Sequence, residues 1–325
     1  MTALLILLLQ TADPGANRAD EPFAQSYSLE RGWDFLENAS LKWQQSRKCV
    51  TCHTNMAYLV TASDPALRRP AHAEVRKYFE DLVAERWPAK GPRWDAEVVV
   101  VALGLAVSES GSDLQPLTRQ ALDRMWTVQK PDGGWNWLKC GWPPMESDDY
   151  YGATVALLAA GRAPGRYLDT PAAQTGVKKA REWLAKNPAP SLHHRGMLLW
   201  ASTVVDGLMA EAERKNVVDE LLALQRPDGG WSTSSFLPWK RADKKESEVE
   251  RSDAYGTGFV IHLARLGGVP AADARLAKGI RWLKTQQRES GRWFTRSLNE
   301  DGKHYLSHAG TAFALLALHA CGESR

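Results

Sequence analysis

Three short segments of the chain repeat one pattern, in which a glutamine precedes a tryptophan by six residues across a glycine-containing turn. They are Gln129–Trp135, Gln225–Trp231 and Gln287–Trp293. The first two contain an intact Pro-Asp-Gly-Gly, in which every residue type favours a tight turn. Such internal repetition predicts one supersecondary unit that is used several times, so it constrains the architecture more than any single residue does.

This pattern resembles the QW motif of squalene–hopene cyclases and the related repeats of protein prenyltransferase β subunits. The resemblance implies an all-α fold, an α/α toroid in which hairpins of outer and inner helices close into a barrel. Amphipathic periodicity predicts six outer helices, near 29–36, 72–85, 114–128, 177–184, 209–224 and 276–283. Apolar segments between them predict six inner helices, near 52–62, 94–108, 148–161, 192–206, 253–266 and 307–321.

We therefore expect a single (α/α)6 toroid over residues 20–325. The start of the chain, Met1–Leu9, is an apolar run that is too short to span a bilayer. It is typical of the hydrophobic part of a secretory signal, although no Lys or Arg precedes it, and Ala19 is a candidate end. We interpret residues 1–19 as a signal peptide and expect an exported, periplasmic or otherwise extracytoplasmic protein with no further membrane segment.

Charge and composition narrow the choice of partners. The net charge is only +3 and no basic block is present, which argues against nucleic acid. Alternation of outer and inner helices makes all inner helices run the same way, so their N-termini meet at one electropositive rim. Most candidate catalytic and ligand-binding residues fall at these N-termini. We therefore expect the partner to be an apolar small molecule or a redox protein.

One segment at this rim, Cys49-Val-Thr-Cys52-His53, matches the c-type haem attachment motif. Chance gives on the order of 0.001 matches in a chain with four Cys and eight His. In such a site both thiols bind the haem vinyl groups and the histidine ligates the iron. Candidates for the distal ligand are His193, His194, His308 and Met145.

The same segment has other interpretations. Cys49 and Cys52 could form a disulfide in an oxidising compartment, or remain as thiols. Together with Cys140 and His53 they could instead bind zinc, since thiolate and imidazole suit that ion. The segment also stands where the first repeat would carry its QW turn. Cys321 is expected to be a buried small residue.

An acidic segment, Glu146-Ser-Asp148-Asp149, precedes another inner helix. It resembles the DxDD motif of squalene–hopene and other class II terpene cyclases, in which the central aspartate protonates an alkene. The resemblance implies that Asp148 is the acid, with Asp149 and Glu146 as flanking carboxylates and a histidine in support. The first motif position is Glu here, and one toroid is about half of a full squalene cyclase.

A structural role for Asp148 is the alternative, because Ser252-Asp253 repeats the pattern at another inner helix and Ser and Asp are favoured helix N-caps. The zinc site of prenyltransferase β subunits is matched by Asp253 and His308, but Tyr255 stands where that site needs Cys. The sequence thus leaves three hypotheses: a haem-bearing redox or ligand-binding module, a terpenoid cyclase-like isomerase or lyase, and a binding module without chemistry.

Overall fold

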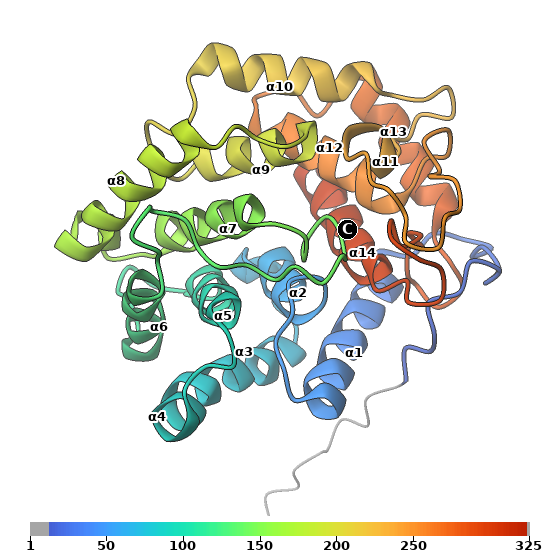
Figure 1. The fold of residues 1–325 in the computed structure, drawn as a ribbon. Coiled ribbons are helices and arrows are strands. Elements are labelled where there is room, and N and C mark those ends of the chain that lie inside the picture. Colours follow the sequence, from blue (N-terminus) through green and yellow to red (C-terminus); the bar gives the residue numbers. More distant parts are fainter. Residues whose placement is uncertain (1–12, 324–325) are drawn as a thin grey trace, which may run out of the picture.

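Residues 13–323 are described by a computed structural model, in which the regular elements are helices joined by turns (Figure 1). Within that range no helix combines the length and the hydrophobicity that crossing a bilayer requires. Of the predicted signal segment, residues 1–12 lie outside the described range.

The helices alternate between an outer and an inner ring. The outer helices are α1 (Leu29–Arg47), α3 (Ala71–Asp81), α6 (Pro116–Thr127), α8 (Pro171–Lys186), α10 (Glu211–Ala223) and α13 (Ala274–Gln286). The inner helices are α2 (Asn55–Thr61), α5 (Asp95–Val107), α7 (Asp149–Arg162), α9 (Leu192–Ser202), α12 (Ala254–Leu266) and α14 (Leu306–Ala320). A π-helical turn, η2 (Leu82–Arg86), and α4 (Trp87–Lys90) extend α3, and η1 (Pro65–Leu67), η3 (Tyr167–Asp169) and α11 (Thr233–Phe236) are short additions.

Each inner helix contacts the next, and α14 contacts α2, so the inner ring is closed. Figure 1 shows the first helix, α1, beside the last, α14. The predicted (α/α)6 toroid is confirmed. Every residue of α14 from Leu306 to Leu318 is buried, as expected for a helix enclosed by neighbours on all sides.

The repeated glutamine–tryptophan turns join neighbouring outer helices. In each turn the tryptophan is completely buried, and its indole N–H donates to a backbone carbonyl ten residues earlier, as from Trp231 to Leu221 at 2.8 Å. The glutamine amide bonds across the turn and also to the next outer helix: Gln225 Nε2 donates to the carbonyls of Gly229 and of Arg275 in α13. Each of these turns therefore holds two neighbouring repeats together, and we call it a glutamine–tryptophan bracket.

The last of these turns closes the ring. Gln287 Nε2 donates to the carbonyl of Ser28, the N-cap residue of α1, at 2.8 Å, and Gln287 Oε1 accepts from the Ser28 N–H at 2.8 Å. Gly291 in this turn has a φ of +91°, and a Cβ at this position would overlap the Arg31 carbonyl. The contact between the last turn and α1 thus requires glycine at position 291.

The first repeat departs from the prediction. Helix α2 begins at Asn55 and not at residue 52, because the Asn55 side chain holds the backbone of residues 49–51 in a non-helical turn. Its Oδ1 accepts from the Thr51 N–H at 2.8 Å, and its Nδ2 donates to the Cys49 carbonyl at 3.2 Å. Cys52 and His53 therefore lie in a turn before the helix.

Replacement of Gly291 by alanine should open the joint between the last repeat and the first. Gly302→Ala is the matched control, since Gly302 also has a positive φ, +104°, but open space around it. Both substitutions should lower the free energy of unfolding by about 1 kcal/mol through backbone strain. Gly291→Ala should lower it by at least about 2 kcal/mol more, because the new Cβ clashes with the Arg31 carbonyl. Urea unfolding of the two variants measures the difference, and equal losses would show that the close approach to α1 contributes nothing.

Candidate functional site

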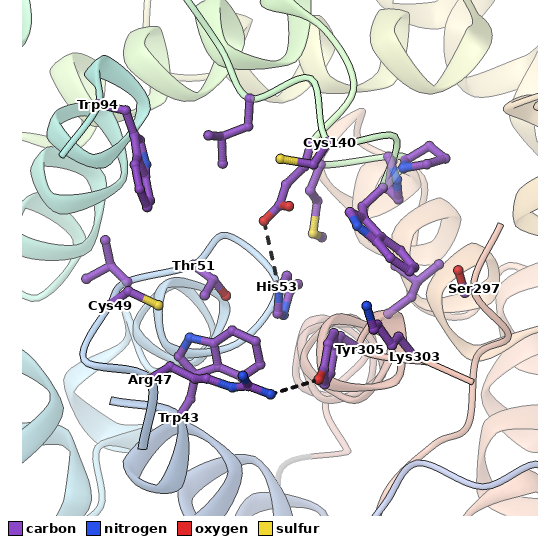
Figure 2. A pocket seen from close by; sticks show the side chains of 18 residues that line it. Trp43, Arg47, Cys49, Thr51, His53, Trp94, Cys140, Ser297, Lys303 and Tyr305 are labelled. Atoms are coloured by element: carbon purple, nitrogen blue, oxygen red, sulfur yellow. Dashed lines mark hydrogen bonds and ion pairs between the residues drawn. The ribbon is translucent and has the colours of Figure 1, made fainter. Parts of the chain in front are cut away.

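A cavity of about 560 Å³ opens at the rim where the inner helices begin (Figure 2). Its walls come from the end of α1, the Cys49–His53 turn, the 138–146 loop and the start of α14. This volume lies in the range of sites for drug-sized ligands and cofactors. The rim was the expected place for chemistry, and this cavity lies there.

Aromatic rings form much of the wall. The His53 imidazole stacks on Tyr305 with ring centres 5.5 Å apart and lies edge-on to Trp43 at 4.9 Å. Trp94 and Trp142 line other sides of the cavity. Two cations stand among these rings: Arg47 lies over Trp43 and donates to the Tyr305 hydroxyl at 3.3 Å, and Lys303 lies over Trp142. The site therefore suits a flat, largely apolar ligand that carries negative groups.

The motif residues divide between two cavities. Cys49 and His53 line the rim cavity (Figure 2), whereas Cys52 is 1% exposed and lines a smaller cavity on the barrel axis. Burial raises the pKa of the Cys52 thiol well above its usual value. All four cysteines of the chain are free thiols.

The zinc alternative requires thiolates and imidazole to converge. Within residues 13–323 no group of three or more His, Cys, Asp or Glu side chains is arranged to hold a metal ion. Cys140 does line the rim cavity, together with Cys49 and His53, but its nearest partner is a carboxyl group. Neither the Cys140 set nor the set of Asp253 and His308 forms such a group.

A buried relay of hydrogen bonds sets the orientation and the tautomer of His53. Arg292 Nη1 donates to Asn17 Oδ1 at 2.7 Å, because a guanidinium can only donate. The Asn17 amide nitrogen therefore donates to His308 Nε2 at 3.0 Å. His308 Nδ1 then carries the proton and donates to the Thr54 hydroxyl at 2.9 Å, which in turn donates to His53 Nδ1 at 2.7 Å.

The consequence is that the His53 proton lies on Nε2. That atom faces the Glu146 carboxylate, with Nε2 and Oε1 3.9 Å apart (Figure 2). Burial lowers the pKa of His53 to about 3, so the ring is neutral at physiological pH. Burial also raises the pKa of Glu146, although a hydrogen bond with Cys140 opposes this effect. Among the three predicted carboxylates, only Glu146 lines the rim cavity.

Asp148 is a helix N-cap. Its Oδ1 accepts from the Tyr151 N–H at 3.0 Å, and its Oδ2 lies 2.8 Å from both His194 Nε2 and the Ser147 hydroxyl. Burial raises the pKa of Asp148, but these hydrogen bonds and the charge of His194 outweigh it and lower the pKa to about 2. A carboxyl group held ionised in this way is poorly suited to protonate an alkene, so the geometry favours the structural alternative.

Asp149 has no place in the cavity either. Its Oδ1 accepts from the Trp137 N–H at 3.0 Å, and Lys139 lies within 3.2 Å of its side chain. Asp253 also caps its helix, accepting from the Gly256 N–H at 2.8 Å, as its repeat of the Asp148 pattern predicted. The acidic cluster thus separates into one helix cap, Asp148, one carboxylate bound to the neighbouring loop, Asp149, and one cavity residue, Glu146.

The four candidates for a distal ligand are also separated. His193 is completely buried and its Nε2 lies 2.8 Å from the Tyr255 hydroxyl, while His194 is held by Asp148 and Ser191. His308 belongs to the relay behind His53. Met145 alone among the four lines the rim cavity.

Comparison with family models gave no match for the sequence, and comparison with the curated proteins gave none either. Solved structures do match. The chain superposes on an ent-copalyl diphosphate synthase from Streptomyces platensis with a TM-score of 0.56 and 16% identity, over 82% of this chain and 50% of that one. It superposes on a type II terpene cyclase, MstE from Scytonema, with a TM-score of 0.52 and 13% identity, over 91% and 98% of the two chains.

The fold is terpene-cyclase-like. This chain spans half of the length of the copalyl diphosphate synthase and nearly all of MstE, whose structure contains geranylgeranyl dihydroxybenzoate. A polysaccharide lyase matches equally well, with a TM-score of 0.52 and 14% identity over 91% and 97% of the chains. Because the same toroid carries such different chemistry, function has to be argued from the cavity.

The axis of this terpene-cyclase-like barrel is largely filled. The cavity there, between Cys52, Met56, Met197 and Phe313, has a volume of only about 30 Å³. It has room for one or two water-sized molecules and none for a folded terpenoid chain. An apolar substrate of that size fits the rim cavity alone.

Several residues of the site were missed at the level of sequence. Trp43, Tyr305 and Lys303 line the cavity, and Asn17 and Thr54 belong to the relay. Trp43 could have been found, because it lies near the end of an outer helix that is followed by no QW turn. Asn17 and Thr54 carry no local signal, since their partners lie 291 and 254 residues away in the chain.

Asp148→Asn should lower stability without removing the cap, because asparagine is also a good N-cap. The pKa of Asp148 is about 2 in the folded chain and 3.8 ordinarily. Its contribution to the free energy of unfolding is therefore present above pH 3.8 and is lost as the pH falls towards 2. We expect a loss of about 1–2 kcal/mol at neutral pH that shrinks in acid. Urea unfolding at pH 7 and pH 3 measures it. Asp113→Asn, an exposed change, should have no effect, and a pH-independent loss would contradict the assignment.

Proposed function

We propose that this chain is an exported module that holds a c-type haem in the rim cavity, attached through Cys49 and Cys52 and ligated by His53. The observation that carries the proposal is that the CxxCH segment forms a wall of the rim cavity, with Cys49 and His53 facing it. Bound there, haem would supply electron transfer or the binding of a small gaseous ligand.

The His53 ring suits ligation in its orientation. Nδ1 is bonded to Thr54, while Nε2 faces the cavity, and a metal-binding histidine is usually fixed through its other nitrogen in this way. Its tautomer has to change, because Nε2 carries the proton in the relay. As long as Asn17 donates to His308, Thr54 Oγ1 has to accept from both histidines, and its own proton then lacks a partner, at a cost of about 1–3 kcal/mol.

The two thiols fit unequally. Cys49 faces the cavity, whereas the Cys52 side chain has to turn from the barrel axis towards the rim. Cys52 lies in the turn before α2 and not within a helix, so this rotation breaks no helical hydrogen bond. Attachment at both thiols therefore requires a local change in the 49–54 turn.

The remaining walls complement a haem. Trp43, Trp94 and Trp142 offer flat apolar surfaces, and Arg47 and Lys303 can pair with the two propionate groups. Met145, which lines the cavity, is the candidate for the sixth ligand.

Expression in an exporting host equipped for c-type maturation tests this proposal. We expect a covalent haem by pyridine haemochrome assay, lost in Cys52→Ala and in Cys49→Ala. Cys140→Ala is the matched control, since this thiol lines the same cavity outside the motif and should leave the yield unchanged. Met145→Leu should keep the haem and change its spectrum. A folded, colourless wild-type protein would contradict the proposal.

A second function is favoured by one observation: Glu146 faces the cavity with a raised pKa beside the neutral His53. A carboxyl group whose pKa is raised by burial can act as a general acid near neutral pH. The alternative is thus a terpenoid cyclase-like isomerase or lyase in which Glu146, in place of Asp148, protonates an apolar substrate in the rim cavity.

Incubation of the colourless protein with linear isoprenoid alcohols, with mass spectrometry of the products, tests the alternative. Glu146→Gln should lower turnover at least about 100-fold, because loss of a general acid typically costs that much. Asp148→Asn should retain turnover as long as the chain is folded. If Asp148→Asn abolishes turnover and Glu146→Gln does not, the assignment of the acid is wrong.

A further inference from the structure

The cavity on the barrel axis is lined by a cluster of sulfur-bearing side chains. All of them are buried, and they are Cys52, Met56, Met145 and Met197. The chain has six methionines. One of them, Met1, lies outside residues 13–323, and three of the remaining five line this single cavity.

The sulfur-bearing side chains reach the cavity from different sides. Cys52 precedes α2 and Met56 lies in α2, whereas Met197 belongs to α9. Because the inner helices contact one another in chain order around a closed ring, α2 and α9 stand on opposite sides of the axis. Met145 comes from the loop at the rim and lines both cavities. The cluster thus surrounds the free space in the way that ligands surround an ion.

The composition of the wall decides which ion suits it. The rest of the lining is apolar or aromatic, and for residues 13–323 it includes no carboxylate, imidazole or charged side chain. Calcium and magnesium require oxygen ligands, which this wall does not offer. A zinc ion paired with one thiolate would leave a net positive charge in an apolar interior.

A soft monovalent ion meets both conditions. Thioethers and thiolates are the ligands that select Cu(I), and one thiolate makes its charge neutral. The volume of about 30 Å³ admits an ion bound directly by protein sulfur, without a shell of water. Methionine also fills irregular gaps in protein cores, but packing alone requires neither a cysteine among the thioethers nor free space between them.

We propose that the barrel axis binds a single Cu(I) ion through the thioethers of Met56, Met145 and Met197 and the thiolate of Cys52. On binding, Cu(I) replaces the thiol proton of Cys52, which passes to solvent, and the oxidation state of the metal does not change. Copper and haem compete for Cys52, because haem attachment requires this side chain to turn towards the rim. The copper site therefore belongs to the haem-free chain.

The full chain, produced without c-type maturation, tests the site by anaerobic competition for Cu(I) with bicinchoninate in the presence of ascorbate. We expect the protein to withhold a single Cu(I) ion per chain. Met56→Leu and Met197→Leu conserve volume, and each should weaken binding at least about tenfold because it removes a sulfur ligand. Met125→Leu is the matched control, since Met125 is buried in α6 away from this cavity and should leave the affinity unchanged.

X-ray absorption at the copper edge provides a second readout, in which we expect sulfur ligands only. The proposal is overturned if the wild type withholds no copper or if Met197→Leu binds like the wild type. A nitrogen ligand in the spectrum, or loss of binding in Cys49→Ala but not in Met56→Leu, would place the ion at the rim and also overturn it. Because these measurements use haem-free protein, their outcome is independent of whether haem binds in the rim cavity.

Discussion

The glutamine–tryptophan brackets are the interaction on which this toroid depends. Helices of 7 to 19 residues are marginal alone, and the outer helices are amphipathic, so each repeat needs its neighbour to be stable. The Trp135, Trp231 and Trp293 indoles fix each turn to the outer helix that precedes it. The glutamine of each turn supplies the link, because its amide donates to a backbone carbonyl of the next outer helix or its N-cap. Because the last bracket reaches Ser28 of the first helix, a linear series of hairpins becomes a ring.

Closure of the ring also determines where chemistry can occur. The inner helices are packed so closely that the axis holds only about 30 Å³ of free space, and the larger cavity is displaced to the rim. In the first repeat no bracket follows the outer helix, and the Cys49–His53 turn stands in its place. The position that lacks a structural turn is therefore the position that forms a wall of the rim cavity.

The periodicity of the sequence was sufficient to predict all six hairpins, because the inner helices are mostly apolar and the outer helices are apolar on one face. The candidate site was predicted in part. Cys49 and His53 belong to a local motif, and Asp148 belongs to a local cap pattern that repeats at Asp253. Glu146 could not be distinguished from its neighbours, since its raised pKa depends on burial beside Cys140. The relay through Asn17 and Thr54 joins opposite ends of the chain, and no local pattern reports such a contact.

The hydrogen-bond relay links the histidine at the rim to Asn17, within the segment that the sequence predicts to be a signal peptide. Asn17 precedes Ala19, the candidate end of the signal segment, so cleavage after Ala19 would remove the amide that donates to His308 Nε2. His308 could then carry its proton on Nε2 and accept from Thr54 at Nδ1. The Thr54 hydroxyl would reverse, His53 would donate from Nδ1, and its Nε2 lone pair would face the cavity. The identity of the atom at the rim, a hydrogen-bond donor or a lone pair, is thus decided by one amide at the far end of the relay.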